Sequence, residues 1–219
     1  MKAETDRLTS LASALGNAAP DFRDSQHIAL SVYRRLAEGS PAPAAEIAER
    51  SGASIERIEE LLRTWPGVFL DNDQRVVGFW GLTIQRLSPT HRIVADGREL
   101  FAWCAWDTLF LPGILRTNLS VESKCPVTDE TITLMVTPQS IVDTSHPDAV
   151  VSFLLPDHAF DAEVVQSFCH FVHFFASPGA AEPWIAEHPG TFSLTLGDAF
   201  ELGRLVNSLN FPSAPGSGR

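Results

Sequence analysis

The sequence changes character near residue 80, and this change limits the folds open to the chain. Before this point, apolar residues recur at helical spacing, as in Ile28, Val32 and Leu36, which lie four residues apart. After it, short apolar runs alternate with turn residues, which predicts strands with tight connections. Segregation of helices and strands along a chain is typical of the α+β class. We therefore expect an α+β fold in two parts, residues 1–80 and residues 81–219.

The first part predicts three helices and a hairpin. The helices are expected over residues 24–37, over residues 41–52 with an end at Gly52, and from an N-cap at Ser54 to about Arg63. Two strands, residues 68–70 and 76–79, flank a polar turn. This order resembles a winged helix, so we expect a winged-helix-like module. Its third helix carries more glutamate than arginine, which favours a packing or assembly role over DNA reading.

The second part predicts a mixed, mainly antiparallel β domain with flanking helices. Strands are expected over residues 82–84, 91–94, 119–121, 131–136 and 150–155. One helix is expected over residues 98–111 and a closing helix over about residues 197–209. The tail after it, SAPGSGR, is of low complexity and is expected to fray.

Charge and cysteine content narrow the class of protein. The 27 acidic and 16 basic residues give a net charge of −11, which disfavours nucleic acid and an anionic membrane surface as partners. No run of about 18 apolar residues and no secretory signal is visible. Three cysteines, Cys104, Cys125 and Cys169, do not form the even-numbered framework of a small secreted domain. We therefore expect a cytoplasmic protein with free thiols.

A first candidate site lies in the helix predicted over residues 98–111. On such a helix Leu100, Cys104, Asp107 and Leu111 share one face, which is otherwise apolar. A carboxylate there is costly unless it is paired, protonated or used in catalysis, and an acid beside a thiol is a candidate proton donor. The alternative is that Asp107 caps a neighbouring loop while Cys104 packs as a small apolar residue.

A second candidate site lies in QSFCHFVHFFAS, residues 166–177. If this segment is extended, Cys169 and His173 face one side and His170 faces the other. A histidine near a thiol lowers the pKa of that thiol, but a histidine between aromatic residues on a strand is more often a hydrogen-bonded core residue. No C-x-x-C or H-E-x-x-H motif is present, so a zinc site is poorly supported. Two thiols with an acid beside one of them suit a soft electrophile that takes two sulfur ligands.

These segments resemble the alkylmercury lyase (organomercurial lyase) family. FAWCAWDTLFLPGILRT, VESKCPVTDETITLMVTP and QSFCHFVHFFAS occur in the order of the family's motifs, AWCAxDTLxxP, a cysteine before a turn and strand, and SFCxxVHFFAS. The resemblance spans about residues 82–200. It implies that residues 81–219 are a catalytic domain. The implied reaction is cleavage of the carbon–mercury bond of alkyl- and arylmercury compounds to a hydrocarbon and Hg(II), without an added cofactor.

The same resemblance implies roles for individual residues. Cys104 matches the first catalytic cysteine, Cys169 the second, and Asp107 the acid, and these three would also hold the Hg(II) product. Cys125 matches a cysteine regarded as structural. Some members have a further cysteine at the position of His170, so this chain has no extra thiol for Hg(II) there.

The resemblance also implies partners and a biological setting. The implied partners are the organomercurial substrate, excess small thiols that release Hg(II), and a mercuric reductase that accepts it. The implied setting is mercury detoxification. A thiol-based metal-binding or metal-responsive protein without lyase activity is the alternative function. Trp103, Trp106 and Phe110 are either walls of an apolar pocket or core residues, and their helical spacing favours the core.

Overall fold

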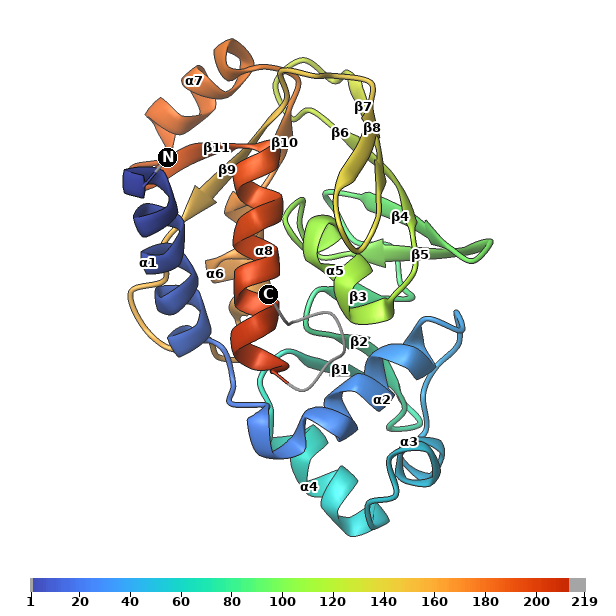
Figure 1. Cartoon of the computed structure of the whole chain (residues 1–219). Helices are drawn as coiled ribbons and strands as arrows, with labels where there is room; N and C mark the ends of the chain where they lie inside the picture. The colour runs from blue at the N-terminus through green and yellow to red at the C-terminus, as the bar shows by residue number, and fades with distance from the viewer. Residues whose placement is uncertain (1, 213–219) are drawn as a thin grey trace.

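The computed structural model describes residues 2–212 and has the expected α+β architecture (Figure 1). The helices are α1 (Lys2–Ala18), α2 (Gln26–Leu36), α3 (Ala44–Ser51), α4 (Ile55–Thr64), α5 (Asp107–Leu115), α6 (Val164–Ser167), α7 (Pro178–Glu187) and α8 (Leu196–Asn210), with 3-10 turns η1 (Arg23–Ser25) and η2 (Cys169–Phe171). The strands are β1 (Val68–Leu70), β2 (Val76–Phe79), β3 (Leu82–Thr83), β4 (His91–Ala95), β5 (Arg98–Ala102), β6 (Leu119–Lys124), β7 (Thr131–Val136), β8 (Ile141–Thr144), β9 (Val150–Leu154), β10 (Phe174–Phe175) and β11 (Thr191–Thr195). The low-complexity tail from residue 213 lies outside the described residues.

The strands form two sheets. The larger has the order β1-β2-β3-β5-β4-β6-β7-β8, and the smaller has the order β10-β9-β11. Every pairing within residues 2–212 is antiparallel, which confirms the predicted sheet type. In β6 and β7, buried and solvent-facing residues largely alternate, so each presents one face to the core. Helix α5 packs against β6 and β7 of the larger sheet and against α8 (Figure 1). Helix α8 contacts β8 of the larger sheet and β9 and β11 of the smaller one, so it lies between the two sheets.

The N-terminal helices follow the sequence closely. Gly52 ends α3 with a φ of 74°, and the Ser54 hydroxyl caps α4 by accepting from the Arg57 N–H. The hairpin β1–β2 forms as predicted, and β2 also pairs with β3, which joins it to the larger sheet. The winged-helix likeness and the division at residue 80 both stay predictions.

One predicted helix is wrong in its first half. Residues 98–102 form β5, which pairs antiparallel with β4. The pairing starts with Ala95 opposite Arg98 and ends with His91 opposite Ala102. The two residues between them, Asp96 and Gly97, have φ values of 47° and 76°, as a two-residue type I′ hairpin requires. Tight-turn chemistry therefore outweighs the helical spacing of Leu100 and Cys104, and the helix begins only at Asp107.

The extended interpretation of residues 166–177 is also wrong for most of the segment. The N–H of Phe168 donates to the Val164 carbonyl, and the N–H of Val172 donates to the Cys169 carbonyl. These bonds wind the chain into α6 and η2, and only Phe174 and Phe175 are extended as a strand. Cys169 therefore lies on a helical turn rather than on a strand face.

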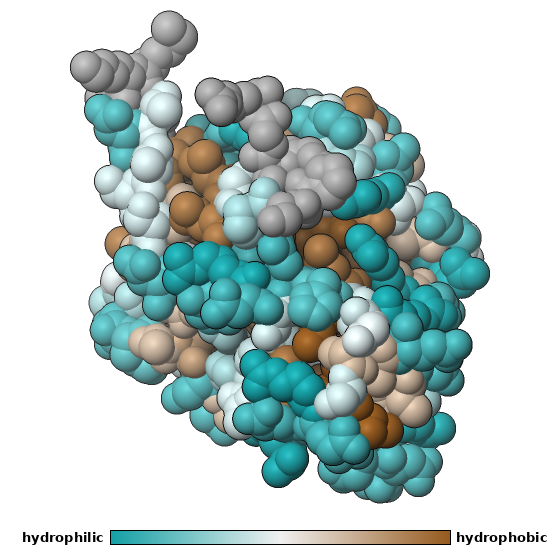
Figure 2. Space-filling view, turned by 60° about the horizontal axis from the view of Figure 1, so that its bottom comes forward, coloured by the Kyte–Doolittle hydropathy of each residue, from teal (hydrophilic) through white to brown (hydrophobic). Residues whose placement is uncertain are grey.

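Several elements were not predicted from the sequence. These are α1, α6, α7, β5, β8, β10 and β11. Helix α1 packs along α8, so residues from the two ends of the described chain lie side by side (Figure 1). Among residues 2–212 there is no helix with the length and apolar character that crossing a membrane requires. One face of the molecule is largely hydrophilic, with apolar residues showing between the polar ones (Figure 2).

Candidate active site

Three residues predicted to form the site converge in the interior. A sulfur from Cys104, a sulfur from Cys169 and a carboxylate oxygen from Asp107 all lie within 4.8 Å of one another. Their exposed fractions are 0%, 4% and 5%. Cys104 lies in the turn between β5 and α5, Asp107 is the first residue of α5, and Cys169 opens η2. The chain therefore assembles two thiols and one acid out of contact with bulk water.

Backbone hydrogen bonds set these positions. The Asp107 Oδ2 atom accepts from the Cys104 N–H at 2.8 Å, so the acid caps the turn that carries the first thiol. The Ala105 N–H donates to the Val172 carbonyl at 3.1 Å and links this turn to the segment of Cys169. From the sequence, capping by Asp107 is an alternative to a place in the site. In the structure the two go together, because the bond that caps the turn also brings the acid beside the thiol.

Burial has the largest effect on the pKa values of Asp107 and Cys104. It raises the pKa of Asp107 to about 7, although hydrogen bonds from Cys104 and from the Trp103 backbone oppose the rise. Burial, the hydrogen bond with Cys169 and the charge of Asp107 raise the pKa of Cys104 well above its usual range. The hydrogen bond with Cys104 lowers the pKa of Cys169, but burial and the Asp107 charge outweigh it. Near neutral pH the site therefore holds two protonated thiols beside a carboxyl that is partly protonated.

Gly81 is a site residue that the sequence reasoning missed. Its φ is +88°, and a Cβ atom on it would lie 2.6 Å from Asp107 Oδ1. A side chain at this position would overlap the carboxyl group, so only glycine leaves room for it. The signal in the sequence was a glycine at the short turn between β2 and β3.

The histidines near Cys169 lie in a separate cluster. His173 is buried, packs edge-on against Trp184 and faces His91 with ring centroids 6.4 Å apart. Burial lowers the pKa of His173 to about 4 and that of His91 to about 3, so both rings are neutral near pH 7. His170 is exposed. The charged and hydrogen-bonding side chains that act on the Cys169 thiol are Cys104 and Asp107.

Cys125 lies apart from the group of three. It is buried in the turn after β6, where its N–H donates to the Glu130 carbonyl and its carbonyl accepts from Asp129. This tight turn joins β6 to β7. Cys125 is thus not part of the group of three, and its structural role stays a prediction.

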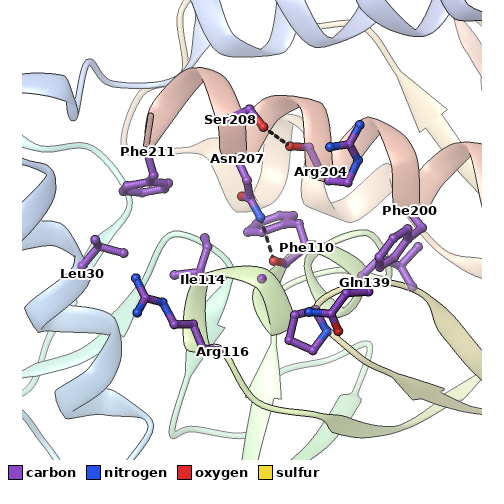
Figure 3. Close-up of a pocket in the computed structure, with 13 residues that line it drawn as sticks. Leu30, Phe110, Ile114, Arg116, Gln139, Phe200, Arg204, Asn207, Ser208 and Phe211 are labelled. Atoms are coloured by element: carbon purple, nitrogen blue, oxygen red, sulfur yellow. Dashed lines mark hydrogen bonds between the residues drawn. The ribbon is translucent and has the colours of Figure 1, made fainter. Parts of the chain in front are cut away.

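Two cavities lie beside α5 and α8, and the residues that line them do not include Cys104, Asp107 or Cys169. The larger, about 420 Å³, opens between α5 and α8, where the Asn207 amide donates to the Phe110 carbonyl at 2.9 Å (Figure 3). The smaller, about 40 Å³, shares four residues with the larger one and is walled partly by Tyr33, Trp80 and Trp106. Trp106 is also a core residue, since its Nε1 donates to the Ala199 carbonyl at 3.0 Å. The smaller cavity therefore borders the sequence neighbours of Asp107 and Gly81.

A buried pair of thiols with a neighbouring carboxylic acid is a set of groups suited to binding a soft metal and to donating a proton beside it. A sequence profile of the alkylmercury lyase family matches residues 87–207. The chain belongs to the alkylmercury lyase family.

Individual relatives agree with the profile. The alkylmercury lyase of Staphylococcus epidermidis is 42% identical over 188 residues, which are 85% of this chain and 84% of that protein. The alkylmercury lyase of Bacillus cereus is 36% identical over 219 residues, which are 100% of this chain and 98% of that protein. The crystal structure of the mercury-bound form of MerB2 superposes with a TM-score of 0.69 at 26% identity, covering 92% of this chain and 98% of that one.

Proposed function

We propose that this protein is an alkylmercury lyase in which Cys104, Cys169 and Asp107 cleave the carbon–mercury bond. The observation that carries the proposal is the convergence of two sulfurs and a carboxylate oxygen within 4.8 Å in a buried place. Mercury is a soft metal that prefers thiolate ligands, and the carbon released from it must receive a proton. The site offers both kinds of group at one point.

The reaction balances with these three side chains. Asp107 takes the proton of one thiol, and the resulting thiolate binds the mercury of the substrate R–Hg–X and displaces X⁻. The second thiol gives its proton to X⁻ or to solvent and also binds mercury. Two sulfur ligands move electron density toward the carbon, and Asp107 returns its proton to that carbon as the carbon–mercury bond breaks. The products are RH, HX and Hg(II) held by two thiolates.

The pKa of Asp107 suits this double role. A group that acts first as a base and then as an acid works best when its pKa lies near the ambient pH, and burial brings that of Asp107 to about 7. An exposed carboxylate would remain ionised at this pH and would be a poor proton donor. Burial of the acid is therefore a functional requirement of the scheme.

The accessory parts of the proposal follow from the chemistry of the product. No added cofactor is required, because the protein and substrate supply every atom and electron pair. Hg(II) held by two buried thiolates leaves by exchange with excess small thiols, and a mercuric reductase is the proposed acceptor. A reducing cytoplasm is the proposed location, since the thiols must stay reduced. The apolar cavity bordered by Trp80 and Trp106 is the proposed place for the organic group.

The test uses phenylmercury with the intact protein and excess small thiol. We expect one benzene and one Hg(II) per substrate consumed, measured by gas chromatography and by a mercury assay. Tight binding of mercury without release of benzene would favour a metal-binding or metal-responsive protein and would overturn the lyase assignment. The membership of the chain in a family of lyases makes that alternative the less favoured one.

A further inference from the structure

The turn that covers the Asp107 carboxyl has an unusual backbone. Trp80 has a φ of +35° and Gly81 a φ of +88°, so two successive residues lie at positive φ. Positive φ is strained for a bulky residue such as tryptophan, and such strain persists only where the surroundings enforce it. The turn places Gly81 directly against the carboxyl, since a Cβ atom there would lie 2.6 Å from Oδ1 and 2.7 Å from Cγ.

The two carboxyl oxygens of Asp107 have different neighbours. Oδ2 accepts from the Cys104 N–H, and Oδ1 faces the turn at Gly81. The Gly81 carbonyl in turn accepts from the Trp103 N–H at 3.0 Å, next to Cys104 in the sequence. A shift of the Trp80–Gly81 turn would therefore let the carboxyl rotate away from the sulfurs.

Tyr33 holds this turn from a distant part of the chain. Its side chain projects from α2, is 2% exposed, and its hydroxyl donates to the Trp80 carbonyl at 2.7 Å. The Trp80 indole is fixed separately, because its Nε1 donates to the Pro66 carbonyl. The Tyr33 ring packs edge-on against Phe79, the residue before Trp80, with centroids 5.0 Å apart. Hydroxyl and ring thus act on the same turn.

We propose that Tyr33 is a positioning residue for the protonation step: its hydroxyl keeps the Trp80–Gly81 turn against the Asp107 carboxyl and so aims the acid at the carbon bound to mercury. This inference rests on the proposed lyase function. The hydroxyl of Tyr33 acts through the turn, because its single O–H already donates to a backbone carbonyl. The Tyr33 ring also walls the smaller cavity, and a substitution that keeps the ring leaves that wall in place. The two sulfurs are set by other contacts, above all the bond from Ala105 to Val172. Loss of the hydroxyl should therefore slow protonation and spare mercury binding.

The test compares Tyr33→Phe with Thr83→Val. The first variant keeps the buried ring and removes only the hydroxyl. The second removes another buried hydroxyl, which donates to the Val77 carbonyl at 2.9 Å and accepts from the Gln85 N–H at 3.0 Å, so its hydrogen-bond partners lie outside the Trp80–Gly81 turn. Two quantities are measured in each: the single-turnover rate of benzene release from phenylmercury, and the affinity for Hg(II) by ultraviolet absorption of the mercury–thiolate bonds.

In Tyr33→Phe we expect benzene release to slow by about tenfold, since a displacement of the order of 1 Å in a catalytic group costs up to about a hundredfold in rate. Hg(II) affinity should stay within about twofold of wild type, and Thr83→Val should match wild type in both measurements.

A wild-type rate in Tyr33→Phe overturns the inference, as does an equal loss of Hg(II) affinity and rate, or the same slowing in Thr83→Val. No benzene from the wild-type protein would instead overturn the lyase function itself, and this inference with it.

Discussion

The carboxylate of Asp107 accepts a hydrogen bond from the backbone N–H of Cys104, with 2.8 Å between oxygen and nitrogen. This contact ties the proposed acid to the backbone of the proposed first mercury ligand. It also means that Asp107 has a structural function as well as a chemical one, since it caps the turn between β5 and α5. Substitutions in the site must therefore be judged on both stability and turnover.

Replacing either site cysteine should abolish turnover. Serine offers a hard oxygen where mercury needs a soft sulfur, so Cys104→Ser and Cys169→Ser should each slow benzene release from phenylmercury by about a thousandfold or more. Cys125→Ala is the matched control, because this thiol is also buried but lies outside the group of three. It should keep the wild-type rate. Full activity in Cys169→Ser would contradict the mechanism with two thiolates.

Removing the proton donor should separate binding from cleavage. Asp107→Asn keeps the shape of the side chain and an oxygen to accept from the Cys104 N–H, but it has no proton to deliver. We expect benzene release to fall by about 10²- to 10⁴-fold, the usual contribution of general acid catalysis. Hg(II) should still bind through the two sulfurs. A variant that releases benzene at the normal rate would exclude Asp107 as the acid.

The buried acid should make the protein less stable as pH rises. The pKa of Asp107 is about 7 in the folded chain against 3.8 as the ordinary value, so between these pH values the folded state binds more protons than the unfolded state. The free energy of unfolding therefore decreases as pH increases from about 4 to about 7, by about 4 kcal/mol in total for this group.

Asp107→Asn provides the comparison for that pH dependence. Denaturant unfolding at pH 5 and pH 8 should show a smaller loss of stability in the asparagine variant, because its side chain does not ionise. If the two proteins lose stability in parallel over this range, the carboxyl does not titrate near 7.

Glycine should be required at position 81 for reasons of space as well as backbone. Gly81→Ala introduces a methyl group 2.6 Å from Asp107 Oδ1, whereas Gly97→Ala meets nothing within 4 Å although its φ of +76° is similarly unfavourable. Both variants suffer strain of about 1–2 kcal/mol from a positive φ. Gly81→Ala should lose substantially more stability than Gly97→Ala, and it alone of the two should lose lyase activity. Equal effects of the two substitutions on thermal unfolding and turnover would show that the carboxyl tolerates displacement.

The sequence predicted local features better than the way distant segments meet. The caps at Gly52 and Ser54 and the strands in residues 119–136 all depend on neighbours within a few positions, and the structure confirms them. Helix α1 was missed although Leu8, Leu11 and Leu15 have helical spacing and are buried. The helical spacing of Leu100 and Cys104 predicts a helix where the structure has β5. The Asp96–Gly97 pair, typical of a two-residue hairpin turn, is the signal in the sequence that points to the strand.

The candidate site shows the same limit. Spacing placed Cys104 and Asp107 together for the wrong reason, a shared helical face, whereas the observed cause is a cap on a turn. Nothing in local spacing brings Cys169 to them, because 65 residues separate it from Cys104. That convergence was implied only by the resemblance to a family. Gly81 and Tyr33 depend on packing across the fold, which a single sequence does not reveal.

The two sulfurs reach the site from different sheets, Cys104 after β5 of the larger one and Cys169 before β10 of the smaller one. An ion bound to both would act as a reversible cross-link that closes a loop of 65 residues, and closing a loop of this size in the unfolded chain is worth about 4 kcal/mol in the chain-entropy model. Bound Hg(II), the product, would then stabilise the folded state, and the protein would be most resistant to thermal unfolding just after cleavage. Removal of Hg(II) should return the temperature of thermal unfolding to that of the mercury-free protein.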